Sequence, residues 1–247
     1  MAELRAVVTG ASSGIGEATV RRLIADGWNV TAVARRGPRL AELAKQTGCD
    51  VFVADVTSDG EIAALADYVR AHGGLNLLVN NAGGALGMEP VAESPLEAWS
   101  EQYEVNVVGT VRVTQALLPM LRESGRGDVL IVTSTAGHEP YERGGGYVAA
   151  KSAEAALART LRLELTGTGV RVMEIAPGMV ATEEFSKNRF GGDEERAAAV
   201  YAGITPLVAE DIADAIGWMV SRPHHVNVDV MVVRPREQGS ATKTVRS

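Results

Sequence analysis

Short runs rich in Val, Leu, Ile and Ala alternate with longer stretches of helical periodicity along most of this chain. The runs lack the apolar–polar alternation of half-exposed strands, so we expect helices to cover both faces of the sheet that they form. This alternation predicts an α/β fold, a doubly wound parallel sheet of the Rossmann type. The candidate strands are Arg5–Thr9, Asn29–Ala34, Asp50–Ala54, Asn76–Asn80, Asp128–Thr133, Val170–Ile175 and Val228–Val233.

The chain is 247 residues long, at the upper end of single-domain size, so we expect one domain over residues 1–247. Hydrophobic residues make up 46% of it, enough to supply a buried core. Residues 177–206 are rich in Gly, Glu, Lys and Asn with weak helical character, and we predict that they form a mobile lid. Residues 238–247 are small and polar, which predicts a flexible tail.

Charge and cysteine content limit the partners and the compartment. With 31 acidic and 24 basic residues the net charge is -7, so the protein repels phosphate backbones and nucleic acid is a poor partner. Cys49 is the only cysteine, which excludes an internal disulfide and fits a reducing compartment. The first residues carry no signal-peptide pattern, and the apolar runs are well short of the ~20 residues that span a bilayer. We expect a soluble, cytoplasmic protein without a membrane partner.

A glycine-rich turn follows the first candidate strand and opens a helix. It reads Thr-Gly-Ala-Ser-Ser-Gly-Ile-Gly from Thr9 to Gly16. Glycines at such a turn allow tight curvature and let a pyrophosphate approach the N-terminus of the helix. A plain strand-to-helix connection is the alternative reading of the turn taken alone. The candidate phosphate-binding residues are Gly10, Ser12, Ser13, Gly14, Ile15 and Gly16.

The residues after the second candidate strand indicate which dinucleotide would bind. A fold that prefers NAD places an acid there to hold the ribose hydroxyls, whereas this chain has Ala34 followed by Arg35 and Arg36. Arginine forks match a 2′-phosphate, and Ser12 could add a hydroxyl donor. Two solvated surface arginines are the alternative. The sequence therefore predicts NADP as the cofactor.

Tyr147 and Lys151 are four residues apart in a segment, residues 146–165, that is predicted to be a helix, so both side chains project from one face. A nearby ammonium favours the phenolate and lowers the pKa of a tyrosine from its ordinary value of about 10, which suits proton exchange. Ser134 ends a strand at the carboxyl edge of the sheet and could hydrogen-bond a substrate oxygen. Taken alone, a Tyr/Lys pair at this spacing is more often a solvated helix face.

Other charged side chains are candidates for substrate or metal binding. Arg143 and Arg189 could each bind a substrate carboxylate through the guanidinium fork, with a solvated loop arginine as the alternative for both. The histidines form no metal-ligand pattern and have no second cysteine to combine with, so we predict no metal. They are His72, His138, His224 and His225.

In combination, these features resemble the short-chain dehydrogenase/reductase family over nearly the whole chain. The residues that carry the resemblance, in family order and spacing, are the turn Thr9–Gly16, Asn80-Asn81-Ala82-Gly83, Asn106, Ser134, Tyr147-x-x-x-Lys151 and Pro177-Gly178. The resemblance implies the strand order 3-2-1-4-5-6-7. It also implies an oxidoreductase that moves a hydride between a nicotinamide and a carbonyl or secondary alcohol carbon.

The resemblance further implies roles for individual residues. Tyr147 would be the general acid/base and Ser134 would orient the carbonyl. Lys151 would hold the nicotinamide ribose and lower the tyrosine pKa, and Asn106 would support a water-linked proton relay. The remaining cofactor contacts that it implies are Asp55 and Val56 at the adenine, Asn80, Ala82 and Gly83 along the cleft, and Pro177, Gly178 and Thr182 at the nicotinamide end.

The same resemblance implies a homotetramer or, failing that, a homodimer. The segment Pro95–Leu121, predicted to be one long helix, and the helix that carries Tyr147 have more small apolar positions than one sheet face needs. Excess apolar surface of this kind favours subunit packing.

Three segments narrow the resemblance to NADP-dependent 3-hydroxy acid dehydrogenases that act on serine-like substrates. They are residues 80–90, Glu184-Phe185-Ser186 with Arg189-Phe190, and residues 223–227. This likeness implies a small 3-hydroxy acid such as serine or allo-threonine as substrate, with Glu184, Arg143 and Arg189 as candidate contacts. Residues 141–146 and 179–183, beside the expected substrate pocket, depart from that branch.

Three other functions stay open. A broad-range ketone or aldehyde reductase would share the same chemistry. A 3-oxoacyl carrier-protein reductase usually ends in a glycine-rich strand and turn, whereas this chain reads Met-Val-Val-Arg-Pro-Arg over residues 231–236. A non-catalytic NADP-sensing protein would be expected to lack the Tyr/Lys pair, which is intact here.

Overall fold

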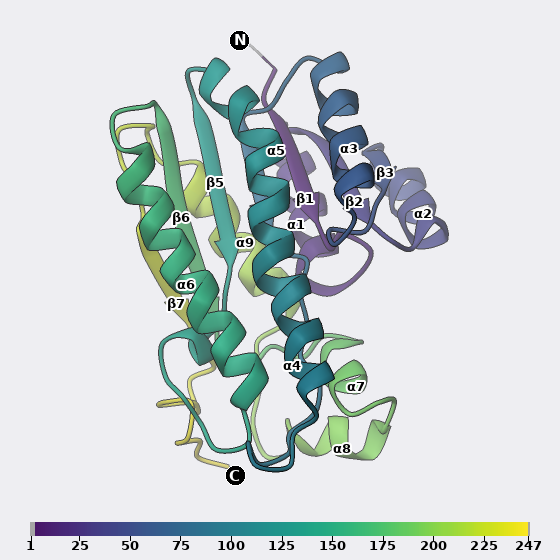
Figure 1. Cartoon of the computed structure of the whole chain (residues 1–247), viewed down its shortest axis with the longest axis vertical. Helices are drawn as coiled ribbons and strands as arrows, with labels where there is room; N and C mark the ends of the chain where they lie inside the picture. The colour runs from purple at the N-terminus through teal and green to yellow at the C-terminus, as the bar shows by residue number, and fades with distance from the viewer. Residues whose placement is uncertain (1–2, 247) are drawn as a thin grey trace.

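The computed structural model describes residues 3–246, so the ends of the expected domain and of the expected tail, residues 1–2 and 247, lie outside it. Seven parallel strands form one sheet in the order β3-β2-β1-β4-β5-β6-β7, with helices in front of and behind it (Figure 1). The predicted doubly wound fold and strand order are therefore confirmed. The strands are β1 (Arg5–Thr9), β2 (Asn29–Ala34), β3 (Asp50–Val53), β4 (Leu77–Asn80), β5 (Gly127–Val132), β6 (Val170–Pro177) and β7 (Val230–Val233).

An apolar core lies on each face of the sheet. Val7 of β1 packs with one group of helices, whereas its neighbours Ala6 and Val8 pack with the other. Both faces of the central strands are thus buried, which explains why their sequences do not alternate. One group comprises α1 (Gly14–Ala25), α2 (Gly37–Thr47) and α9 (Ala209–Val220), and the other comprises α3 (Asp59–Ala71), α5 (Gly109–Glu123) and α6 (Gly145–Leu165).

Local sequence signals set several helix ends. Pro38 stands in the first turn of α2, where a proline costs no hydrogen bond. Gly48 ends that helix with a left-handed φ of 76°, a conformation that glycine adopts without strain. Ser58 caps α3 by accepting a hydrogen bond from the backbone N–H of Glu61.

The segment predicted as one helix from Pro95 to Leu121 is interrupted. It consists of α4 (Leu96–Tyr103), a π-helical segment Glu104–Val108, and α5. Asn106 lies in the π-helical segment and is fully buried. Such segments inside longer helices occur frequently at functional sites, where they redirect a side chain.

The predicted lid contains two short helices, α7 (Phe185–Arg189) and α8 (Glu194–Ala199), which lie at the lower end of the molecule beside the C-terminal segment (Figure 1). The tail differs from the expectation of a frayed end. Gln238 is buried and pairs with Thr244, and the guanidinium of Arg246 donates hydrogen bonds to lid carbonyls. These contacts are polar and bury little apolar surface, so the composition of the tail does not predict them. Within residues 3–246, no helix combines the length and apolarity that a membrane crossing requires.

Candidate active site

A cavity of about 910 Å³ opens at the carboxyl ends of the strands, which is where open α/β sheets bind ligands. We call its sheet-side wall the floor: the glycine-rich turn, the ends of β2, β4, β5 and β6, and the start of α6. We call the opposite wall the roof: the lid and the tail. The predicted site residues that line the cavity are Gly10, Ser12, Ser13, Gly14, Ile15, Arg35, Arg36, Asp55, Val56, Ala82, Gly83, Ser134, Tyr147, Lys151, Pro177, Gly178, Thr182, Glu184 and Arg189.

The glycine-rich turn is packed against the loop after β4. Gly10 and Gly14 have left-handed φ angles of 66° and 54°. A Cβ atom on Gly16 would lie 2.4 Å from the carbonyl oxygen of Gly10, so only glycine fits there, although Gly16 itself does not line the cavity. The amide of Asn81, which also lines the cavity, donates a 2.9 Å hydrogen bond to the carbonyl of Thr9. The turn is thereby fixed without any ligand.

The guanidinium of Arg36 lies over this turn and, with nearby serine hydroxyls, provides hydrogen-bond donors for an anion. Its guanidinium donates to the hydroxyl of Ser12, at 3.1 and 2.8 Å, and to that of Ser13, at 2.9 Å. The carboxylate of Glu184 from the lid accepts hydrogen bonds from both Arg36 and Ser13. Arg36 and Ser13 hold the pKa of Glu184 below its usual range. A lid carboxylate thus occupies the donors that the sequence assigns to a 2′-phosphate.

Arg35, the second predicted arginine, is in a different environment. Its side chain is 73% exposed, and its guanidinium lies 3.7 Å from the carboxylate of Asp55. Asp55 also accepts hydrogen bonds from the backbone and the hydroxyl of Thr57, at 2.9 and 2.8 Å. Arg36 is therefore the better placed of the two arginines to bind an anion at the turn.

The segment before Tyr147 contains three consecutive glycines, Gly144 to Gly146, and is one of the two segments that depart from the related dehydrogenases. Close packing explains the glycines. Cβ atoms on Gly145 and Gly146 would lie 2.7 Å from the ring of Trp99 and 2.6 Å from the amide of Gln102. The start of α6 is therefore packed tightly on α4. This close approach fixes the part of α6 that carries Tyr147.

Tyr147 is 8% exposed and its ring packs edge-on against Phe185 of the lid, with ring centroids 5.7 Å apart. Burial raises the pKa of Tyr147, and the charge of Lys151 and the hydroxyl of Ser134 offset that rise only in part. The net direction is therefore upward, opposite to the lowering expected from the lysine. The lysine acts as predicted, but burial outweighs it.

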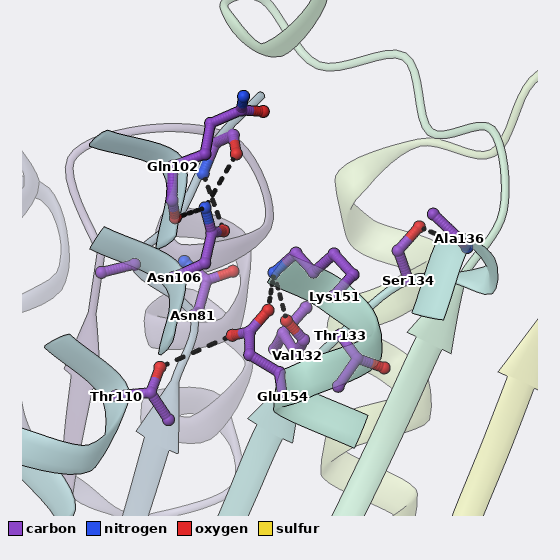
Figure 2. Close-up of polar contacts among 12 residues, drawn as sticks. Asn81, Gln102, Asn106, Thr110, Val132, Thr133, Ser134, Ala136, Lys151 and Glu154 are labelled. Carbon is purple, nitrogen blue, oxygen red and sulfur yellow. Dashed lines mark hydrogen bonds and ion pairs between the residues drawn. The ribbon is translucent and has the colours of Figure 1, made fainter. Parts of the chain in front are cut away.

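Lys151 is buried beneath Tyr147, with its Nζ atom 6.0 Å from the centre of the phenol ring. Figure 2 shows its ammonium between two oxygens: it donates to the carbonyl of Val132 at 3.1 Å and lies 2.7 Å from a carboxylate oxygen of Glu154. Sequence reasoning missed Glu154. Its position, three residues after Lys151 on the same helix, was the signal that could have found it.

Asn106 and Asn80, both predicted site residues, do not line the cavity. The amide of Asn106 donates to the carbonyls of Gly84 and Gln102 and accepts from the backbone N–H of Gly84 (Figure 2). Asn80 is buried and donates to the hydroxyl of Thr114. Asn106 therefore holds the loop after β4, whereas Asn80 joins the end of β4 to α5. The relay role of Asn106 stays a prediction.

The three predicted substrate residues do not come together. Arg189 lines the cavity, where its guanidinium donates to the hydroxyl of Tyr141 at 3.0 Å and lies 5.6 Å from the ring of Tyr147. Glu184 lies instead at the anion site of Arg36. Arg143 lies outside the cavity, with a left-handed φ of 65° and a hydrogen bond to the carbonyl of Met88. Loop geometry separates these residues, and their sequence spacing does not reveal it.

Several residues that line the cavity were not predicted. They lack a catalytic signature, because most are apolar or come from the tail, which had been expected to be free. They include Met88, Tyr141, Phe185, Tyr201, Gln238 and Thr242. Gln238 is held by the backbone N–H of Met179, which donates to it at 2.9 Å.

Two features noted in the sequence, the segment 223–227 and His138, do not line the cavity. In the segment 223–227, Asn227 pairs with both backbone groups of Val172, near the start of β6 and so at the opposite end of that strand from the cavity. His138 contacts the buried carboxylate of Glu174 at 2.7 Å. Among residues 3–246, no group of three or more His, Cys, Asp and Glu side chains is arranged to hold a metal ion.

Comparisons with known proteins agree over most of the chain. Residues 5–190 match the family model for short chain dehydrogenases. An uncharacterized oxidoreductase of Mycobacterium tuberculosis is 57% identical over 96% of this chain and 93% of its own length. An NADP-dependent 3-hydroxy acid dehydrogenase of Salmonella typhi is 38% identical over 97% of this chain and 98% of its own length.

Solved structures give the same result. The closed form of a serine dehydrogenase complexed with NADP+ has a TM-score of 0.92 and 38% identity, over 99% of this chain and all of that chain. A serine dehydrogenase from Escherichia coli has a TM-score of 0.82 and 33% identity, over 96% of this chain and all of that chain. The resemblance inferred from the sequence is confirmed: the chain belongs to the short-chain dehydrogenase/reductase family.

Proposed function

We propose that the protein is an NADP-dependent oxidoreductase that interconverts an alcohol and its carbonyl compound. The observation that carries the proposal is that one cavity joins the glycine-rich turn and Arg36 to Ser134, Tyr147 and Lys151. A cofactor and a substrate bound together in this cavity could therefore both reach the proton-transfer group. Family membership supports the same chemistry.

The chain's own residues fit NADP. Arg36 with the hydroxyls of Ser12 and Ser13 offers donors that suit a 2′-phosphate. The carboxylate of Glu184 already accepts hydrogen bonds from two of these groups, Arg36 and Ser13, as an anion would. Gly10 lets the turn pack closely on the loop after β4, because a Cβ atom there would lie 2.8 Å from the amide nitrogen of Asn81 and 2.9 Å from the Cα atom of Ala82. When bound, the nicotinamide supplies or accepts the hydride. Relatives described as NADP-dependent add support.

Each catalytic side chain then has one task. Tyr147 gives its phenol proton to the substrate oxygen during reduction and takes it back during oxidation. Ser134 donates a hydrogen bond to the same oxygen and so polarises the carbonyl. Lys151 keeps a positive charge beside the phenol, which favours the phenolate form that accepts a proton. Tyr147 and Lys151 are buried and Ser134 is partly buried, which keeps water from weakening these interactions.

For the substrate we propose a small 3-hydroxy acid such as serine or allo-threonine. The guanidinium of Arg189 faces the cavity close to Tyr147 and can bind a carboxylate bidentately. The described activities of two relatives point the same way. The apolar side chains of Met88 and Phe185 in the same wall favour the second candidate, a broad-range ketone or aldehyde reductase.

A panel of substrates separates these candidates. L-serine, D-serine, L-allo-threonine and 3-hydroxybutyrate are tested with NADP and with NAD, and simple ketones are tested with NADPH. The proposal predicts turnover of hydroxy acids with preference for NADP. Turnover of ketones alone would favour the broad-range reductase. Binding of NADPH without any turnover would favour a non-catalytic sensor.

We further propose a cytoplasmic homotetramer or homodimer. Leu163 of α6 and Leu96 of α4 are about four-fifths exposed, at 80% and 77%, which is unusual for large apolar side chains. Pairing of subunits would cover them. Light scattering on the purified protein tests this proposal, and a monomer at micromolar concentration would contradict it.

A further inference from the structure

A buried carboxylate lies beside the catalytic lysine, away from the cavity. Glu154 is 1% exposed and does not line the cavity, whereas Lys151 does. The two groups are 2.7 Å apart, the distance of an ion pair, although the angle is outside hydrogen-bonding geometry. The hydroxyl of Thr110 on α5 donates to the other carboxylate oxygen at 3.5 Å (Figure 2).

An apolar residue would be the ordinary occupant of this position. Glu154 lies on the sheet-facing side of α6, where Ala155 and Ala158 are also fully buried. Burying a carboxylate costs free energy unless a charge compensates it, and apolar residues often replace buried ion pairs without loss of stability. Within residues 3–246, Lys151 is the only cation that forms an ion pair with Glu154. The carboxylate is therefore best explained by what it does to the lysine.

Glu154 restricts where the ammonium of Lys151 can point. A lysine has three N–H donors. One is used by the carbonyl of Val132 and another is drawn to Glu154. One donor remains for the cavity and the cofactor ribose. We propose that Glu154 is a positioning residue, which acts through Lys151 by holding its ammonium in place and keeping it charged.

The electrostatic directions agree with this geometry. Burial lowers the pKa of Lys151, but the carboxylate of Glu154, together with Tyr147 and Glu174, outweighs burial and the pKa is raised. Glu154 also contributes to the raised pKa of Tyr147. Burial raises the pKa of Glu154 itself to about 7, against the opposing effect of Lys151. Because the carboxylate is charged only above that pH, its effect on Lys151 grows as the pH rises through about 7.

The other titratable groups near Glu154 have separate partners. Glu174 on β6 is fully buried and also raises the pKa of Glu154. It accepts hydrogen bonds from Thr133 and lies against the ring of His138, each at 2.7 Å. Lys151 and Tyr147 are the ionisable groups of α6 that are coupled to Glu154. A His138→Gln variant is therefore a control for any contribution of this histidine to the measured pH profiles.

The inference rests on the proposed function and is tested with two measurements on the full chain. One is NADPH affinity as a function of pH, which needs no substrate, and the other is the pH profile of alcohol oxidation. Glu154→Gln removes the charge and nearly keeps the shape. We expect the alkaline loss of NADPH affinity and the alkaline rise of oxidation to move to lower pH by roughly one unit, because the pKa values of Lys151 and Tyr147 both fall.

Glu164→Gln is the matched control, because it removes an exposed carboxylate from the same helix. It should leave both profiles unchanged. If Glu154→Gln does not fold, Glu154→Asp keeps a carboxylate but draws it away from the ammonium, and it should move both profiles in the same direction by less. A folded variant of either kind with both profiles unmoved would overturn the inference, even if its melting temperature had dropped.

The design separates failure of the inference from failure of the proposed function. If the wild type oxidises no tested alcohol, but its NADPH affinity falls at a lower pH in Glu154→Gln, the proposed function fails and the inference stands. If the wild type is active and Glu154→Gln keeps both wild-type pH profiles, the function stands and the inference falls.

Discussion

The floor and the roof of the cavity are held in different ways. In the floor, Lys151 and Asn81 are fixed by buried or half-buried hydrogen bonds to backbone groups. In the roof, the corresponding contacts are ion pairs and hydrogen bonds of half-exposed arginines, such as Arg36 to Glu184 and Arg246 to Ala202. Exposed ion pairs stabilise little, whereas buried hydrogen-bonded groups are costly to disturb. The floor is therefore suited to fixed chemistry, and the roof to selection among substrates.

Removal of the phenol hydroxyl should have the largest effect. Tyr147→Phe keeps the ring that packs on Phe185 but removes the proton-transfer group. We expect kcat to fall by about 100- to 10,000-fold for every substrate alike, with NADPH affinity changed by less than about tenfold because one polar group of many is lost. Steady-state kinetics and a fluorescence titration measure the two quantities. A substrate-dependent loss would contradict the assignment of the floor to chemistry.

Arg36→Ala should have the next largest effect, and on the cofactor only. Loss of a charge-assisted contact to the 2′-phosphate should raise the KM for NADP by roughly 10- to 100-fold and leave that for NAD nearly unchanged. Arg35→Ala is the control, since that side chain is 73% exposed. If Arg36→Ala and Arg35→Ala changed the ratio of the KM values for NADP and NAD equally, the assignment of the 2′-phosphate to Arg36 would be contradicted.

Arg189→Ala tests the roof directly. If its guanidinium binds the substrate carboxylate, KM for hydroxy acids should rise by about tenfold or more, while kcat for simple ketones changes little. Arg189→Lys keeps the charge but loses the fork, so we expect it to reverse part of the rise in KM for hydroxy acids. This variant separates the contribution of the charge from that of the bidentate geometry. An equal loss with acids and ketones would mean that Arg189 only supports the wall near Tyr141.

Glu184→Gln should have the smallest effect and in the opposite direction. The carboxylate of Glu184 competes with a phosphate for Arg36, so its neutralisation should raise NADP affinity by roughly two- to fivefold, a modest factor because the arginine is half-exposed. Glu183→Gln removes a neighbouring carboxylate that forms an ion pair with the exposed Arg39, and it should change nothing. Calorimetric titration with NADP measures both, and weaker binding by Glu184→Gln would contradict the competition.

The same contrast separates what the sequence could predict from what it could not. The strands were predicted nearly to the residue, because a buried strand is visible in the sequence as a continuous run of apolar residues. β1 and β2 match their predicted bounds, and β6 extends two residues further, to Pro177. Tyr147, Lys151 and Ser134 were also predicted, since helical spacing and the strand end bring them together. These are all features of the floor.

What the sequence did not predict has three separate causes. Glu184 and Arg143 were expected at the substrate, but their positions depend on loop conformations that a sequence pattern does not encode. The π-helical segment was missed because the apolar pattern around Asn106 continues as in an ordinary helix. Glu154 was passed over because a glutamate on a helix is usually solvated, and only packing reveals that it is buried.

The most direct test of the central claim follows the hydride itself. NADPH that carries deuterium at the reactive nicotinamide carbon is incubated with the wild type and a carbonyl substrate, and the product is analysed by mass spectrometry and NMR. The account predicts deuterium on the carbon that bears the new hydroxyl, with transfer slowed by at least about 100-fold in Tyr147→Phe. Tight binding of NADPH without label transfer, or transfer at an undiminished rate in Tyr147→Phe, would contradict it.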